Sequence, residues 1–177
     1  LKDSDVNGFE IVIKKGSVYD LHLAGTTINL KREKNAIKIK SLLQTNGKLN
    51  FSQIKKISTL FGINIGHVKD INGVVDLKTH INFDLDKKFK VVDLAYSVEG
   101  DIAYFEIYTK EKKIIKKYLP KYDSKIILKD TNIKLINTKL DHTVELSGFM
   151  KVEENFDNFK IKEIYNYDKK SFNVYGI

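Results

Sequence analysis

The sequence predicts a mainly β protein: a long antiparallel meander sheet with one short helix. The first observation behind this prediction is an alternation over residues 75–85, where most odd positions are apolar and the even positions are polar or charged. Successive side chains of a strand point to opposite faces, so this segment has one apolar face and one wet face. An antiparallel sheet with one solvated side needs that pattern.

The second observation is that shorter segments repeat the alternation along the chain. Apolar residues that share a parity are Phe9, Ile11 and Ile13; Tyr19, Leu21 and Leu23; Ile37 and Ile39; Val92, Leu94, Tyr96 and Val98; Ala103, Phe105 and Ile107; Ile133 and Leu135; Val144 and Leu146; and Phe159 and Ile161. Residues that tolerate positive φ separate several of them, at Lys15-Gly16, Asn46-Gly47, Asn72-Gly73 and Glu99-Gly100-Asp101. We therefore expect hairpin turns at these glycines and roughly nine to eleven strands.

The third observation is a change to helical spacing over residues 50–61. Apolar residues there fall at Phe51, Ile54, Ile57, Leu60 and Phe61. Asn50 can cap the amino end with Gln53 three residues later, and Gly62 can cap the carboxyl end. This predicts one short amphipathic helix packed over an end or edge of the sheet. The stretch 110–122 fits either a second helical turn or an irregular strand that ends near Pro120.

The composition limits the possible functions. The net charge is +8 from 31 basic and 23 acidic residues, but Arg32 is the only arginine. Arg is the side chain that forms paired hydrogen bonds with phosphates and base edges. No nucleic-acid partner is therefore expected, although Lys169 and Lys170 lie among Tyr165, Tyr167, Phe172 and Tyr175, a mixture that can bind single strands. No apolar run exceeds about four residues, far below the ~20 needed to span a membrane.

Motifs of known chemistry are absent. There is no cysteine, and His22, His67, His80 and His142 have no metal-ligand spacing. No phosphate loop, dinucleotide fingerprint or nucleophile elbow occurs. We therefore expect neither an enzyme nor a cofactor or metal site.

Three short segments recur in the same order. Leu1–Val6 resembles 128–133, residues 20–25 resemble 143–148, and residues 37–42 resemble 159–164, each at a spacing of about 125 residues. Recurring units predict an array in which each unit buries its apolar face against its neighbours. We interpret 1–127 as one unit, including the helix near 50–61, and 128–177 as the start of the next.

The run Ile71-Asn72-Gly73-Val74-Val75-Asp76-Leu77 follows the predicted helix, and in this it resembles the helix-then-strand passage of AsmA-like envelope proteins. The Leu-Lys-Asp openings at 1 and 128 and the Leu-x-Gly endings at 25 and 148 resemble strand boundaries in that family. The resemblance implies repeating β-groove units, in which a meander sheet curls into an open groove. It also implies a periplasmic protein, fixed to the bacterial inner membrane by an anchor outside this segment, that conducts phospholipids to the outer membrane.

On this interpretation the partners are phospholipid acyl chains, the inner membrane and neighbouring units of the same chain. The candidate groove-lining residues are Val75, Leu77, Ile81, Phe83, Leu85, Val92, Leu94, Tyr96 and Val98. One alternative is a closed β-sandwich that serves as a spacer or interaction module, and a further one is a basic sheet that binds single-stranded nucleic acid. The groove and the sandwich differ in shape, because a groove leaves a long row of apolar residues accessible and a sandwich buries them all.

Overall fold

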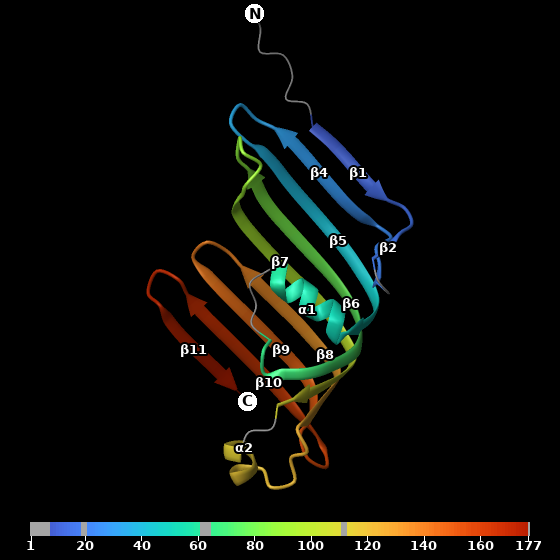
Figure 1. The fold of residues 1–177 in the computed structure, drawn as a ribbon, viewed down its shortest axis with the longest axis vertical. Helices are drawn as coiled ribbons and strands as arrows, with labels where there is room; N and C mark the ends of the chain where they lie inside the picture. The colour runs from blue at the N-terminus through green and yellow to red at the C-terminus, as the bar shows by residue number, and fades with distance from the viewer. Residues whose placement is uncertain (1–7, 19–20, 61–64, 111–112, 177) are drawn as a thin grey trace, which may run out of the picture.

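The computed structural model describes residues 8–18, 21–60, 65–110 and 113–176. They form one 11-stranded sheet in which every pairing is antiparallel and the main path runs β1-β4-β5-β6-β7-β8-β9-β10-β11 (Figure 1). The strands are β1 (Gly8–Ile13), β2 (Ser17–Val18), β3 (Leu21–His22), β4 (Thr26–Arg32), β5 (Ile37–Asn50), β6 (Val68–Leu85), β7 (Val91–Thr109), β8 (Lys125–Asn137), β9 (Asp141–Lys151), β10 (Phe156–Asn166) and β11 (Ser171–Gly176). The helices are α1 (Phe51–Leu60) and α2 (Lys113–Tyr118).

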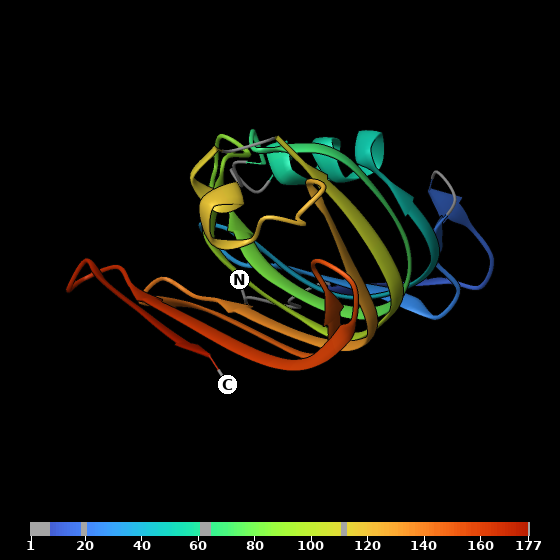
Figure 2. The same cartoon turned by 90° about the horizontal axis from the view of Figure 1, so that it is seen from below.

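The sheet is open and strongly curled, which confirms the predicted fold class. Figure 2 shows the longest strands bending back on themselves, so that the sheet has a concave and a convex face. Among the described residues no second sheet covers the concave face, so the closed sandwich is wrong. The sheet does not close into a barrel, because β1 and β11 each pair on one side only.

The bend in the long strands is built from glycines and bulges. Gly100 of β7 pairs with Leu77 and has φ +148°, and a Cβ there would lie 2.1 Å from the backbone oxygen of Asp76. An extra residue in β7 shifts the β6–β7 register next to Val75, and an extra residue in β8 at Asp130 shifts the β8–β9 register. Bulges of this kind bend the strand that carries them and increase its twist.

The predicted hairpin turns at Asn46-Gly47, Asn72-Gly73 and Gly100 are wrong. All three glycines lie inside the long strands β5, β6 and β7. Position 73 requires glycine, because the Phe105 ring occupies the space that a Cβ would fill. A Cβ built on Gly73 would lie 1.5 Å from Phe105 Cδ1. Glycine in a strand therefore marks a bend or a close approach here, and the turns lie elsewhere.

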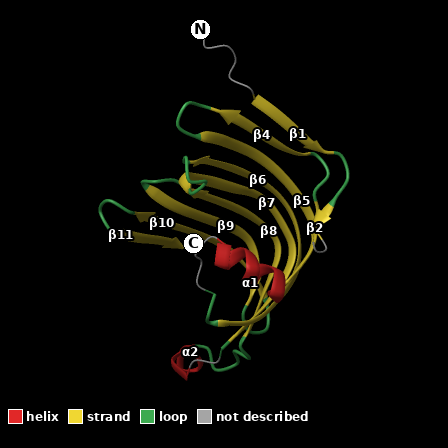
Figure 3. Ribbon diagram, turned by 45° about the horizontal axis from the view of Figure 1, so that its top comes forward, coloured by secondary structure: helices red, strands yellow, loops and turns green. Residues whose placement is uncertain are grey.

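The core lies in the crook of the bend, under α1. Leu21, Leu49, Val75 and Ile102 are the buried cluster, and Ile54 of α1 packs against it. Figure 3 shows α1 lying across the concave side of the sheet. The predicted capping box is present: the backbone N–H of Asn50 donates to Gln53 Oε1 (2.7 Å), and that of Gln53 donates to Asn50 Oδ1 (3.1 Å). The predicted C-cap, Gly62, lies outside the described residues.

A second helix, α2, occupies part of the stretch that the sequence left open, so the expectation of one helix is corrected to two. Pro120 follows two residues after its end, where a proline cannot continue the helix. Beside it the buried Tyr122 hydroxyl lies 2.6 Å from Thr109 Oγ1, which fastens the connection to the end of β7.

The recurring segments occupy neighbouring strands. Residues 143–148 and 159–164 lie in β9 and β10, and 37–42 lies in β5, whose neighbours are β3 and β4 on one side and β6 on the other. Leu1–Val6 lies outside the described residues. The proposed unit boundary after residue 127 falls inside β8, which pairs with both β7 and β9, so the sheet runs through it without a linker. The division into units stays a prediction.

Candidate functional site

Beyond the core under α1, the concave face of the sheet carries further large apolar side chains. Residues directly opposite each other in an antiparallel pair point to the same face, so the register defines rows of side chains across the strands. One row joins Phe9, Leu30, Ile39 and Phe83 on β1, β4, β5 and β6. Four strands that are neighbours in the sheet thus contribute one large apolar side chain each to the same row.

The apolar rows continue through the second half of the sheet. Val98, Leu135 and Val144 are paired across β7, β8 and β9. The next row joins Ile133, Leu146 and Ile161 on β8, β9 and β10. Apolar rows therefore lie on the concave face from the β1 edge to β10, next to the β11 edge, although Thr79 and Glu163 flank the Val98 row.

Seven of the nine candidate lining residues lie on this face and are half-buried. They are Leu77, Ile81, Phe83 and Leu85 of β6 and Leu94, Tyr96 and Val98 of β7. Their neighbours on the other strands were not among the candidates, because a single strand's alternation does not say which strands lie beside it. The signal that could have found them is the same parity in segments 9–13, 37–39 and 133–135.

The other two candidates do not line the accessible part of this face. Val75 is only 3% exposed and belongs to the core under α1, so it is not accessible to a ligand. Val92 pairs with Asp84 on the convex face, because an extra residue, Asp93 with φ +56°, shifts the β6–β7 register between Leu94 and Val92. The same effect moves Ala103, which was grouped with Phe105: it is exposed, and Ile102 takes the buried position.

Large apolar side chains remain exposed at both ends of the concave face. Phe9 is 66% exposed and Ile11 50% on β1, and Val174 is 57% exposed on β11. Soluble proteins rarely leave a contiguous apolar surface of this extent open to water, and such surfaces mark binding sites.

The apolar rows give way to polar and aromatic groups near the turns that join β8 to β9 and β10 to β11. The Tyr167 hydroxyl donates to Asn137 Oδ1 (2.8 Å), and the Tyr165 and Tyr167 rings meet edge to face, 5.2 Å between centroids. Burial, followed by the nearby Tyr167 hydroxyl, raises the pKa of Tyr96. This border offers hydrogen-bonding groups beside an apolar surface.

The convex face is polar by contrast. Register aligns Lys78, Glu99, Lys134, Glu145 and Lys162 in one row across five strands, so that the charges alternate in sign. Lys162 Nζ lies 2.7 Å from Glu145 Oε1, and this hydrogen bond lowers the pKa of Glu145. A second polar cluster centres on Glu106, which pairs with Lys125 Nζ at 2.6 Å and accepts from the Tyr104 hydroxyl at 2.6 Å. The two faces thus differ sharply in chemistry.

Within the described ranges, no three His, Asp or Glu side chains gather closely enough to hold a metal ion. None of the helices in the described part of the chain is long and apolar enough to cross a membrane. Comparisons with protein-family models, with curated proteins and with solved structures find no match to this chain.

Proposed function

We propose that the concave face binds the acyl chains of phospholipids and lets them slide along the sheet. The observation that carries this proposal is the open sheet itself: rows of apolar side chains run across its strands from one free edge toward the other. Acyl chains are the ligand whose length and lack of hydrogen-bonding groups match such a surface.

The dimensions of the sheet are compatible with a lipid. Neighbouring strands lie about 4.8 Å apart, so the main path of nine strands is roughly 40 Å wide. One leaflet contributes about half of a ~30 Å hydrocarbon core, so a whole acyl chain fits within this span.

The energetics favour passive movement. Transfer of a CH₂ group from water to an apolar surrounding contributes about 0.8 kcal/mol, so a chain lying on the concave face avoids most of the cost of leaving a bilayer. Because each row places apolar side chains on three or four neighbouring strands, a chain that moves by one strand within a row keeps an apolar surface beneath it. The polar border near Tyr96 and Tyr167 gives headgroups a place to remain hydrated.

The resemblance to AsmA-like envelope proteins supports the same proposal from the sequence side. Within it, the chain is a periplasmic segment of an array that is fixed to the inner membrane by an anchor elsewhere. The array conducts phospholipids between the envelope membranes, and the sheet edges β1 and β11 are where neighbouring units join.

Site-specific photocrosslinking in cells tests the proposal, and β7 offers a matched pair of positions. Leu94 lies on the concave face, whereas Val92, two residues earlier on the same strand, lies on the convex face and is 40% exposed. A photoreactive phenylalanine at position 94 is expected to yield phospholipid adducts, detected by mass spectrometry, and the same residue at position 92 is not. Lipid capture that is absent at 94, or equal at the two positions, refutes the proposal.

A further inference from the structure

Four hairpin turns follow one another along one rim of the sheet, at the end of the strands opposite to α2 (Figure 1). They join β4 to β5, β6 to β7, β8 to β9 and β10 to β11. Together with the adjoining strand ends Lys31, Arg32 and Asp141 they comprise residues 31–36, 86–90, 138–141 and 167–170, here called the turn rim. The position on one rim follows from the meander, because every second connection of an antiparallel sheet lies at the same end.

The turn rim is basic. It contains nine Lys or Arg and four Asp or Glu residues, and the basic ones are Lys31, Arg32, Lys34, Lys87, Lys88, Lys90, Lys139, Lys169 and Lys170. The turn 86–90 concentrates this charge as Asp86-Lys87-Lys88-Phe89-Lys90. Its single carboxylate is occupied by the backbone, since Asp86 Oδ1 accepts from the N–H of Lys88 (2.7 Å) and of Lys90 (2.9 Å). Within the described residues no acidic side chain forms an ion pair with these three lysines.

Each of the last three turns also exposes a large apolar or aromatic side chain. Phe89 is 73% exposed, Leu140 is 58% exposed and Tyr167 is 41% exposed. Lysines lie beside all three in sequence or one residue away. The turn rim therefore exposes apolar side chains that are flanked by lysines. Surfaces that bind to the headgroup region of anionic bilayers have this composition.

Phe89 is held outward at a cost to the fold. Its φ is +58°, a left-handed conformation that favours glycine or asparagine and strains other residues. Two backbone hydrogen bonds enforce it, from Phe89 N–H to the Asp86 oxygen (2.9 Å) and from Asp86 N–H to the Lys90 oxygen (3.0 Å). A glycine would satisfy this turn better, so the presence of an exposed ring indicates a use for it outside the fold.

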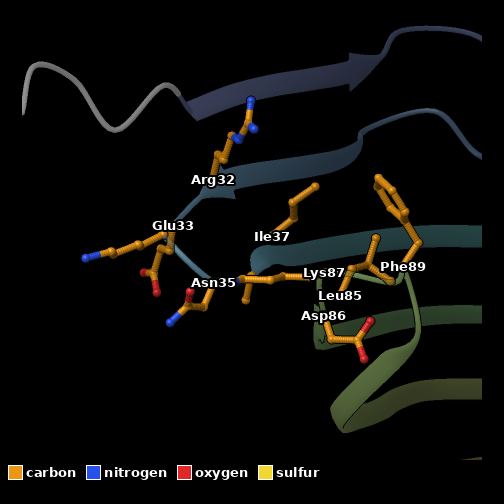
Figure 4. Close-up of a pocket in the computed structure, with 10 residues that line it drawn as sticks. Arg32, Glu33, Asn35, Ile37, Leu85, Asp86, Lys87 and Phe89 are labelled. Carbon is orange, nitrogen blue, oxygen red and sulfur yellow. The ribbon is translucent and has the colours of Figure 1, made fainter.

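The Phe89 ring also lies at the end of the concave face that borders the turn rim. Figure 4 shows it standing on the same side of the sheet as Ile37 and Leu85, and Arg32 of β4 lines the same pocket. Ile37 and Leu85 are paired and belong to the last apolar row before the turns. An apolar group that inserts into a bilayer here would bring the apolar rows directly to the lipid.

We propose that the turn rim docks on the surface of an anionic phospholipid bilayer, with Phe89 and Leu140 inserted among the headgroups and the lysines paired with phosphates. Charge complementarity and the strained, outward aromatic select this occupant. A single-stranded polyanion would use the charge, but it gives no reason to place Leu140 in a turn. The docking surface is separate from the acyl-chain site and does not depend on it.

The chain has no tryptophan, so a single Trp reports on one position. Phe89→Trp places the reporter on the turn rim, and Tyr118→Trp, also at a 73% exposed aromatic and next to two lysines, places it beyond the far end of β7 as a matched control. With phosphatidylglycerol-rich vesicles, the emission of Phe89→Trp is expected to shift to the blue and that of Tyr118→Trp is not. With pure phosphatidylcholine vesicles neither is expected to shift.

The charge is tested by the triple variant Lys87→Gln, Lys88→Gln, Lys90→Gln. Each lysine at an anionic surface contributes about fivefold to binding, so vesicle cosedimentation is expected to weaken on the order of 100-fold. The control triple Lys48→Gln, Lys55→Gln, Lys69→Gln, away from the turn rim, is expected to leave it within severalfold. Equal losses in the two triples, equal Trp shifts at 89 and 118, or a shift at 89 with single-stranded RNA as large as with vesicles, each overturns the proposal.

The same variants separate this proposal from the acyl-chain site. Leu94→Asp is expected to keep vesicle docking while losing bound lipid. If docking survives but position 94 captures no lipid, the acyl-chain proposal fails alone. If position 94 captures lipid but docking is absent, the turn-rim proposal fails alone.

Discussion

The bend of the long strands depends on Gly100, and Gly100→Ala tests how the concave face is formed. The backbone at this position has φ +148°, which L side chains rarely adopt. An added Cβ would lie 2.1 Å from the Asp76 oxygen and 2.9 Å from the Leu77 Cα. Both of these atoms are backbone of β6, so no side-chain rotation can make room for the new methyl group.

The expected cost follows from what must move. Relief of the clash requires the β6–β7 ladder to open at Leu77, and each lost hydrogen bond with an unsatisfied group costs about 1–3 kcal/mol. Backbone strain at a non-glycine residue with this φ adds about 1–3 kcal/mol. Together these terms predict destabilisation by roughly 2–6 kcal/mol, which reaches the upper end for single substitutions.

Urea denaturation followed by circular dichroism measures this change. With an m-value of about 1–3 kcal/mol/M, the midpoint is expected to fall by more than 1 M. Gly176→Ala is the control, because a Cβ there has no atom within 4 Å, and its midpoint is expected to stay unchanged. A Gly100→Ala protein as stable as the Gly176→Ala protein would show that the bend does not rest on this glycine.

Three further predictions address the turn rim, the convex face and the helix. Phe89→Gly is expected to raise the free energy of unfolding by about 0.5–1 kcal/mol, because it removes left-handed strain, while it abolishes vesicle docking; loss of stability would contradict the strain. Glu145 has a lowered pKa through Lys162, so its stabilisation is present above pH ~4.5 and is lost as the pH falls through the lower folded-state pKa. Glu145→Gln is therefore expected to flatten this part of a denaturation-midpoint profile against pH, and a profile unchanged from the parent protein would argue against the pairing. Asn50→Ala removes the N-cap of α1 and is expected to cost about 1 kcal/mol, measured by urea denaturation, with Ser52→Ala as an exposed control; equal effects would argue against the capping box.

Local patterns in the sequence predicted several elements of the fold correctly. The alternation over residues 75–85 predicts a strand with one apolar face, and that segment forms the C-terminal part of β6 with its odd positions on the concave face. Asn50 and Gln53 predict the start of α1, and both hydrogen bonds of the capping box are present. These predictions succeed because each depends only on residues within a few positions of each other.

The features that the sequence patterns did not predict depend on contacts between strands. Asn72-Gly73 has the composition of a turn, yet the Phe105 ring from the neighbouring strand needs the space that a side chain at Gly73 would fill. Val92 has the parity of Leu94, yet one extra residue at Asp93 turns it to the other face. Neither effect is visible in one strand, because a bulge exists only relative to its partner.

The sequence by itself determined that the chain forms antiparallel strands with one apolar face, since that follows from side-chain alternation along a single strand. Only the tertiary structure decided that this face stays open. Openness is set by cross-strand register, by bulges beside Val75 and Asp130 and by a glycine at position 100, which together curl the sheet without closing it. These features act between strands far apart in sequence, where alternation carries no information.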